Sequence, residues 1–202
     1  MDEASKTTKR RLASGDPRYK ERWVVGRCID VGCGHDPLKK EDWPRLTEVV
    51  PYDQILGHRD ATFLPEHADE TFDTVHSSHC LEHLQNPRAA LVNWLRVLKP
   101  GGFIVCTVPE ELLYECGKWP SRFNPDHKNS FTLRGSSVMP QSINVLFLLW
   151  KVGVVLDVEH ISLMTTGWDP AKFGTDQTAY PDSAVECAIE FIIRKPDPGK
   201  GW

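Results

Sequence analysis

The segment at residues 27–37, RCIDVGCGHDP, most constrains the fold, because an apolar run containing a single acid leads directly into two glycines. Such a run at residues 28–31 is typical of a buried parallel strand, and Gly32 and Gly34 predict a tight loop at its end. Glycine reaches positive φ at no steric cost and has no Cβ, so a ligand can approach the main chain there. The HDP that follows predicts a helix start, since Asp is a favoured N-cap and Pro fits the first helical position. This order favours an α/β nucleotide-binding fold, although the same pattern also forms turns that bind nothing.

Length and composition predict one ordinary globular domain. The 202 residues are 40% hydrophobic and 26% charged, which is typical of a chain with a single packed core. A net charge of −4 and a pI near 6.1 give no electrostatic footprint for nucleic acid. The basic cluster from Lys6 to Arg11 predicts a solvated, flexible tail at residues 1–15, followed by a single domain at 16–202.

The cysteines and the apolar segments indicate a cytoplasmic protein. Six cysteines are scattered without C-x-x-C pairing, as expected of reduced thiols in a core. The N-terminal residues lack the apolar stretch of a signal peptide. The most apolar segment, residues 143–156, is interrupted by Lys151 and is too short to span a bilayer, so no membrane span is expected.

The chain alternates strand-like and helix-like segments, which predicts a doubly wound, mostly parallel sheet. The expected strands lie at residues 27–31, 47–53, 60–62, 70–78, 103–108, 152–158 and 188–194. The expected helices lie at residues 16–23, 37–46, 86–98 and 143–150. Residues 111–141, rich in Pro, Trp and charge, predict an insertion on the acceptor side.

Asp53 closes the expected second strand, 19 positions after Gly34. That spacing suits a βαβ unit in which an acid at the tip of the second strand accepts hydrogen bonds from ribose hydroxyls. Ligands of such sheets bind at the carboxyl ends of the strands. The sequence therefore predicts a nucleoside site that Gly32, Gly34 and Asp53 share.

Five motifs in order make the chain resemble the class I S-adenosylmethionine-dependent methyltransferases, in particular the small type-11-like group. They are IDVGCG, the acid Asp53, DATFLP, FDTVHSSHCLEHL and RVLKPGGFIVCTVP, and they cover about residues 27–109. The resemblance implies a Rossmann-like, three-layer αβα fold with seven strands. It also implies an antiparallel last strand at residues 188–194, and S-adenosylmethionine as cofactor with S-adenosylhomocysteine as product.

The resemblance also implies where the cofactor binds. The motif residues would line its methionine and ribose portion, hold the ribose hydroxyls through Asp53, meet the adenine edge through Asp60 and Ala61, and support the sulfonium end. The full set is Asp30, Gly32, Cys33, Gly34, Asp53, Gln54, Asp60, Ala61, Ser77, Ser78 and His79. One departure from the family is Asp36, which stands where a third glycine is common.

Two rival chemistries match parts of the sequence. A dinucleotide enzyme would need glycine where Pro37 stands. The run His79-Cys80-Leu81-Glu82-His83 fits the H-x-x-E-H pattern, in which a zinc protease places two histidines on one helix face. Here the run follows a buried strand at once and leaves little room for a helix before Pro87. We therefore expect a strand-to-helix corner and no metal site.

The acceptor side carries the candidate catalytic residues. His127 is the leading candidate for a general base because imidazole titrates near neutral pH, and Asp126 is expected to orient it, although a solvated surface histidine fits equally well. Glu110, at the tip of the fifth strand, and Tyr19, in an expected N-terminal lid over the cofactor, are further candidates. We expect methyl transfer to an O, N or C atom of a small-molecule or sugar- or lipid-linked acceptor. The alternative is an inactive cofactor-binding partner or regulatory protein. The acceptor's identity and the oligomeric state do not follow from the sequence.

Overall fold

One mixed sheet organises the computed structural model, which describes residues 3–179 and 184–199. Its strand order is β2-β1-β3-β4-β8-β7, and β8 alone runs antiparallel to its two neighbours. The strands are β1 (Gly26–Val31), β2 (Leu46–Tyr52), β3 (Phe72–Ser78), β4 (Leu98–Pro109), β7 (Asp157–Met164) and β8 (Ala188–Arg194). Two short strands, β5 (Ser130–Thr132) and β6 (Ser142–Asn144), pair separately. The antiparallel last strand and the mostly parallel sheet are confirmed.

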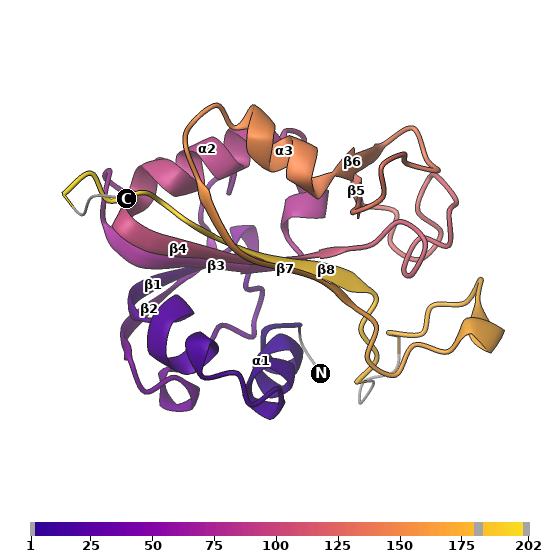
Figure 1. The fold of residues 1–202 in the computed structure, drawn as a ribbon, viewed down its shortest axis with the longest axis horizontal. Helices are drawn as coiled ribbons and strands as arrows, with labels where there is room; N and C mark the ends of the chain where they lie inside the picture. Colours follow the sequence, from indigo (N-terminus) through magenta and orange to yellow (C-terminus); the bar gives the residue numbers. More distant parts are fainter. Residues whose placement is uncertain (1–2, 180–183, 200–202) are drawn as a thin grey trace.

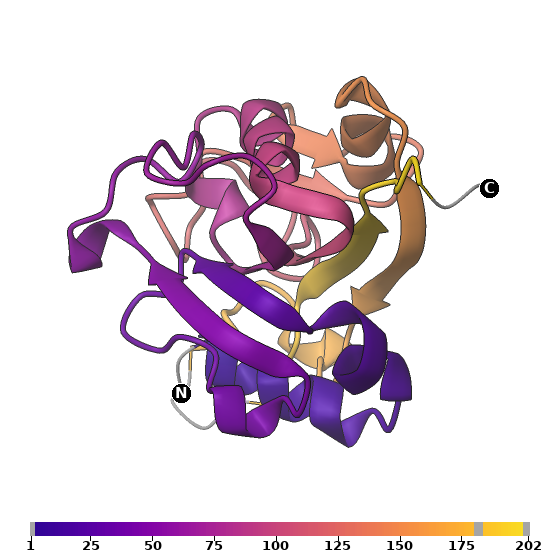
Figure 2. The ribbon, with the colours of Figure 1, turned by 90° about the vertical axis from the view of Figure 1, so that its left-hand side faces the viewer.

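Helices cover both faces of this sheet, which confirms the three-layer αβα arrangement. Helices α2 (Pro87–Val97) and α3 (Val145–Lys151) lie on one face, and α1 (Glu3–Ala13) lies on the other (Figure 1). Beside α1 runs a short π-helical turn, Tyr19–Trp23, whose Trp23 is fully buried. Figure 2 looks onto the β2 edge and shows the twist of the sheet from there. Each face therefore has its own apolar core.

The capping residues and the apolar spacing of α2 explain why this helix forms. The Asn86 side chain accepts a hydrogen bond from the Ala89 amide (3.0 Å), and Pro87 occupies the first turn. The apolar residues of α2 recur at helical spacing and are buried in the core, where α2 packs on β4: Ala90, Leu91, Trp94, Leu95 and Val97. Large-to-small changes in such a row typically cost about 2–5 kcal/mol each.

The sheet has six strands where seven were expected. The segment at residues 60–62 forms a turn and no strand, because the preceding residues 54–59 are taken up by a 3-10 turn, Gln54–Leu56, that ends at Gly57. Too little chain remains for a helix that could carry a further strand back to the sheet edge. The strand expected at 152–158 begins later, at Asp157. β2 is therefore an edge strand.

One expected helix is missing, and most of the expected flexible tail is helical. No helix follows the glycine loop, where only a 3-10 turn at Lys40–Asp42 forms. Asp36, expected to cap that helix, accepts hydrogen bonds from the backbone amide and the hydroxyl of Ser5 in α1 (2.8 and 2.7 Å). Residues 3–13 of the expected flexible tail are the docked helix α1, because Arg11 finds buried polar partners beneath the sheet. Residues 1–2 lie outside the described part of the chain.

A buried ion-pair network fixes α1 to the sheet. Arg11 Nε donates to Glu190 Oε2 on β8 (2.8 Å), and Arg10 donates to both oxygens of the same carboxylate (3.2 and 2.6 Å). Tyr19 Oη also donates to Glu190. Burial alone raises the pKa of Glu190, but the two guanidinium groups outweigh it and hold that pKa well below its ordinary value. The carboxylate is therefore ionised and fully paired.

The same network continues to the glycine loop. Arg11 donates to His76 Nε2 on β3 (2.7 Å), so the opposite nitrogen, Nδ1, carries the proton and donates to Asp30 Oδ1 on β1 (2.5 Å). The second oxygen of Asp30 accepts the Leu38 amide (2.7 Å). These interactions form one continuous network that joins β8, α1, β3, β1 and the segment after the glycine loop.

Candidate functional site

A cavity of about 470 Å³ lies at the carboxyl ends of the parallel strands. Five of the predicted cofactor residues line it: Gly32, Asp53, Gln54, Ala61 and His79. Residues that sequence reasoning did not place there complete the wall: Cys80, His83, Leu84, Asp126 and Lys128. This edge of the sheet is where ligands of open α/β folds bind, so the cavity lies where the glycine motif predicts it.

The two loop glycines serve different purposes. Both have positive φ, +74° at Gly32 and +57° at Gly34. A Cβ on Gly32 would lie 2.3 Å from the Cβ of Cys80, so this glycine lets the chain after β3 pack against the loop. A Cβ on Gly34 would meet nothing within 4 Å, so there is open space beside its backbone, but Gly34 itself is not among the residues that line the cavity.

Substitution of these glycines should separate packing from conformational strain. We expect Gly32→Ala to lower the free energy of unfolding by about 3 kcal/mol or more, because the methyl group collides with Cys80 as well as straining φ. Gly34→Ala, the matched control, carries the strain alone and should cost about 1 kcal/mol. Urea unfolding followed by circular dichroism measures both. Equal losses of unfolding free energy in the two variants would contradict the close contact between Gly32 and Cys80.

Asp53 is held rigidly at the mouth of the cavity. Its Oδ2 accepts the Gly34 amide (2.9 Å), and its Oδ1 accepts the Ile55 amide (3.0 Å) as the N-cap of the next turn. The neighbouring His58 ring stacks on Tyr52, with centroids 4.6 Å apart. The carboxylate is half-buried and has lone pairs to spare, so it can accept hydrogen bonds from a ligand.

The adenine-side residues lie on one anchored turn. Ala61 is buried, and its carbonyl accepts a hydrogen bond from Trp94 Nε1 of α2 (2.9 Å). Asp60 is exposed, does not line the cavity, and accepts the Thr62 amide (2.7 Å). Asp60 therefore shapes the turn while Ala61 faces the cavity.

The structure places the other predicted cofactor residues away from the cavity lining. Asp30 is 1% exposed, and His76 and Leu38 occupy both of its oxygens, so it positions the loop and cannot contact a ligand directly. Ser77 and Ser78 are buried at the end of β3, and Cys33 is buried in the loop.

His79, in contrast, lines the cavity. It adopts φ +54°, a rare backbone conformation that brings the chain out of the strand and into the cavity.

A second cavity, of about 210 Å³, shares His79 and His83 with the first. It is also lined by Glu82, Tyr114, Asn124 and His127. His127 is 8% exposed, and its Nδ1 lies 2.6 Å from Glu115 Oε1, so Glu115 orients it. The expected partner, Asp126, instead lies 2.9 Å from Nδ1 of His83.

Glu82 lies at the centre of this group. Its carboxylate is fully buried, with Oε1 at 3.4 Å from His79 Nδ1 and 4.0 Å from His127 Nε2. Burial alone raises the pKa of Glu82, but the surrounding imidazoles of His79, His83 and His127 outweigh it and hold the pKa below its ordinary value. The group therefore combines a buried negative charge with several imidazole nitrogens.

Glu110 follows directly after β4, at the expected strand tip, whereas Tyr19 does not lie where a lid over the cofactor was expected. Glu110 is 1% exposed, lines neither of these cavities, and accepts the amides of Leu112 and Leu113 (2.7 and 2.9 Å). Burial raises its pKa above the ordinary value. Tyr19 lies beneath the sheet and forms no lid over the cofactor cavity. Burial and the charge of Glu190 raise the pKa of Tyr19 to about 12, so it is a poor base.

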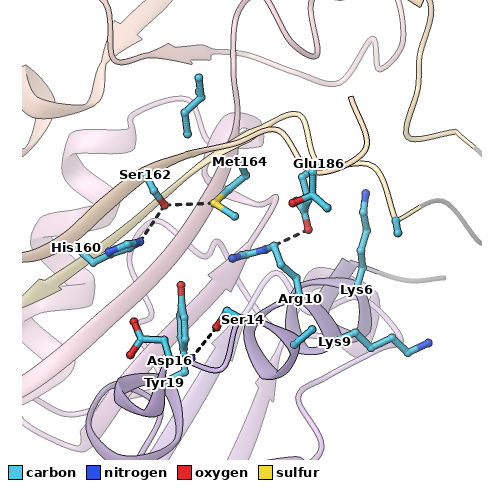
Figure 3. Close-up of a pocket in the computed structure, with 14 residues that line it drawn as sticks. Lys6, Lys9, Arg10, Ser14, Asp16, Tyr19, His160, Ser162, Met164 and Glu186 are labelled. Atoms are coloured by element: carbon cyan, nitrogen blue, oxygen red, sulfur yellow. Dashed lines mark hydrogen bonds and ion pairs between the residues drawn. The ribbon is translucent and has the colours of Figure 1, made fainter. Parts of the chain in front are cut away.

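A third and larger cavity, of about 740 Å³, lies between α1 and β7. Lys6, Lys9 and Arg10 of α1 form one wall, and His160, Ser162 and Met164 of β7 are among the residues opposite (Figure 3). Lys6 and Glu186 line this cavity and also the one that contains His127. The three cavities therefore adjoin through shared residues.

A family model described as a methyltransferase domain matches residues 4–165, which is most of the chain. The chain belongs to this family. The fold and the match together make it a class I methyltransferase of the S-adenosylmethionine-dependent type. Members of this class take their methyl group from S-adenosylmethionine.

Relatives and solved structures agree with this assignment. The chain is 45% identical to an uncharacterised methyltransferase of Schizosaccharomyces pombe over 58 residues, which are 29% of this chain but only 20% of the yeast protein. Its fold is similar to an S-adenosylmethionine-dependent methyltransferase from Archaeoglobus fulgidus (TM-score 0.55, 18% identity, 94% and 93% of the two chains). It is also similar to one from Mesorhizobium loti (TM-score 0.56, 16% identity, 88% and 95%). At these identities the solved structures support the fold alone.

No helix in the described ranges, 3–179 and 184–199, is long and apolar enough to cross a membrane.

Proposed function

We propose that the methyltransferase moves the methyl group of S-adenosylmethionine to an oxygen, nitrogen or carbon atom of a small-molecule or sugar- or lipid-linked acceptor. The observation that carries this proposal is the pair of adjoining cavities at the carboxyl edge of the sheet. One contains the ligand-ready carboxylate of Asp53, and the other contains the oriented imidazole of His127. We further propose a cytosolic location, a single domain over residues 16–202 that includes the insertion at 111–141, and docking of α1 onto that domain.

The residues present fit the cofactor. The open backbone of Gly34 gives room for close approach, and Asp53 has acceptor capacity left for ribose hydroxyls. Gln54 and Ala61 would flank the adenine, with Gly32 and His79 nearer the methionine end. When bound, the cofactor supplies an electrophilic methyl group on a sulfonium. The chain's own task is to hold that group and the acceptor in line and to keep water out.

Among the three predicted catalytic residues, the contacts favour His127 as the acceptor-side group. Glu115 engages Nδ1, which leaves Nε2 directed toward Glu82. A nitrogen so placed can take the proton that a hydroxyl or amine acceptor loses, or it can bind a cation that polarises the acceptor. Glu110 and Tyr19 have their polar atoms engaged elsewhere, so we assign them structural roles.

Calorimetric titration with S-adenosylmethionine and S-adenosylhomocysteine tests the proposal. We expect saturable binding of each at one site per chain, with micromolar dissociation constants, followed by methyl transfer in an acceptor screen with radiolabelled cofactor. The folded state of the same preparation is checked by circular dichroism. Folded protein that binds neither compound would refute the proposed function. Binding without transfer to any acceptor class would favour the regulatory alternative.

A further inference from the structure

We propose that Glu82, His83 and His127 bind a divalent transition-metal ion, with Zn²⁺ the best match, next to the cofactor cavity. One possible ligand atom from each of the three residues lies within 4.8 Å of the other two. Two imidazoles and one carboxylate are a recurrent donor set of catalytic zinc sites, where three protein ligands leave a further position for substrate or water. The proposed role in catalysis rests on the proposed function; the binding of metal does not.

The buried carboxylate of Glu82 gives the first argument. Both of its oxygens are inaccessible to solvent, and neither accepts a hydrogen bond of good geometry among the described residues, although His79 Nδ1 lies 3.4 Å from Oε1. A buried carboxylate without such partners is costly, and buried charges are as a rule paired or bound to metal. The backbone carbonyl of Glu82 accepts the amides of Lys128 and Asn129 (2.8 and 3.1 Å), which fixes the insertion over this carboxylate. The insertion thus holds the Glu82 carboxylate in its buried position.

The orientation of the two histidines gives the second argument. Each has a carboxylate at Nδ1: Glu115 at 2.6 Å from His127 and Asp126 at 2.9 Å from His83. A metal-bound histidine almost always donates its other ring N–H to a carboxylate, a carbonyl or water, which fixes the tautomer and the ring orientation. Nε2 is therefore the atom available on both rings. His127 Nε2 already lies 4.0 Å from Glu82 Oε1, and two ligands on one tetrahedral zinc are about 3.4 Å apart.

The location gives the third argument. His83 lines the cofactor cavity as well as the cavity that holds Glu82 and His127. An ion at this boundary would bind an acceptor that carries oxygen donors and would lower the pKa of a coordinating hydroxyl. The acceptor class that this chemistry selects is an oxygen-rich molecule whose methylated atom is a hydroxyl oxygen. The hydroxyl proton would pass to solvent, and the oxygen lone pair would form the new bond to carbon as the carbon–sulfur bond breaks.

Metal titration of tag-free, chelator-treated protein tests the site without any methyl acceptor. We expect one Zn²⁺ per chain by calorimetry, and visible absorption bands of a histidine- and oxygen-bound ion when Co²⁺ is used. His127→Ala and Glu82→Gln should each weaken Zn²⁺ binding by about 100-fold or more. Glu115→Gln, which keeps all three ligands, should weaken it by about 10- to 100-fold. The control His160→Gln changes a histidine on β7, away from the cluster, and should leave binding unchanged.

The outcomes separate this inference from the proposed function. Titration of the same preparations with S-adenosylhomocysteine should change by less than about threefold across the variants. Zn²⁺ binding that these changes weaken, in a protein that binds no cofactor, would uphold the metal site and refute the methyltransferase activity. Cofactor binding without stoichiometric Zn²⁺ or a Co²⁺ spectrum would overturn the metal site and leave His127 as a base. If a variant fails to fold, the Co²⁺ spectrum of the wild-type protein still decides.

Discussion

Replacing Arg11 with methionine is expected to lower the free energy of unfolding by about 3–5 kcal/mol, because the change leaves a buried carboxylate short of a partner. Arg11 is 1% exposed and Glu190 is 0% exposed, and their ion pair joins α1 to β8. His76 would lose its donor in the same step. Urea denaturation followed by circular dichroism, with the slope of the transition checked for constancy, measures the loss.

Arg22→Met is the matched control. Arg22 also pairs with a glutamate, Glu159, but about half of its side chain is exposed, so the loss should be below about 1 kcal/mol. If Arg11→Met cost no more than Arg22→Met, α1 would not be docked as described.

Acid should weaken the same network. The pKa of Glu190 lies below that of an unfolded glutamate, about 4.3, so its contribution to stability is complete above that pH range. The contribution is then lost as the pH falls toward the folded-state value. Glu190→Gln should therefore flatten the acid limb of the stability profile, and an unchanged limb would contradict the assignment.

Replacing Asp53 with alanine is expected to weaken the binding of S-adenosylmethionine and S-adenosylhomocysteine by about 100-fold. The change removes a charged acceptor for ribose hydroxyls and also frees the Gly34 amide that the carboxylate holds at 2.9 Å. A hydrogen bond to a charged group contributes about 1.5–3 kcal/mol, so the loss of one such bond already corresponds to about one to two powers of ten in affinity. Isothermal titration calorimetry measures it directly.

Two further variants show whether the loss of cofactor affinity comes from the Asp53 carboxylate itself. Asp53→Asn keeps one oxygen acceptor and should fall between wild type and alanine. Glu48→Ala removes the same charge from the other end of β2, where the side chain is exposed and pairs with Arg27, and should leave affinity unchanged. A loss in the Glu48 variant as large as in Asp53→Ala would mean that net charge, and not the carboxylate at the cavity, governs binding.

The parallel half of the fold could be predicted because its signals are local. Apolar runs that end in Gly32, Asp53 or His79 mark where each strand stops, and parallel strands bring those ends to one edge of the sheet. The third strand was predicted wrongly, because only six residues separate Asp53 from Asp60 and they form a turn that carries no strand back to the sheet. Helix α1 could not be predicted, because the partner that makes Arg11 a buried residue lies 179 positions away.

The candidate metal group shows the same limit. The H-x-x-E-H run suggested zinc only through a helix, and the chain forms a 3-10 turn at Leu81–His83 instead. Glu82 and His83 nevertheless meet a third ligand, His127, which the insertion supplies. No local periodicity could indicate that meeting, because it depends on how the insertion folds back over Glu82.

The attachment of α1 to β8 also sets an order of events during synthesis. Ser5 holds the segment after the glycine loop through Asp36, while Arg11 reaches its partner only when Glu190 has been made. Helix α1 must therefore wait for β8, because Glu190 lies 179 positions after Arg11. Contacts of such long sequence separation form slowly. A growing chain that stops short of β8 has its glycine loop and earlier strands, but it lacks the ion pairs that hold α1 and the loop in position. We therefore expect the nascent protein to bind cofactor only after β8 has been made.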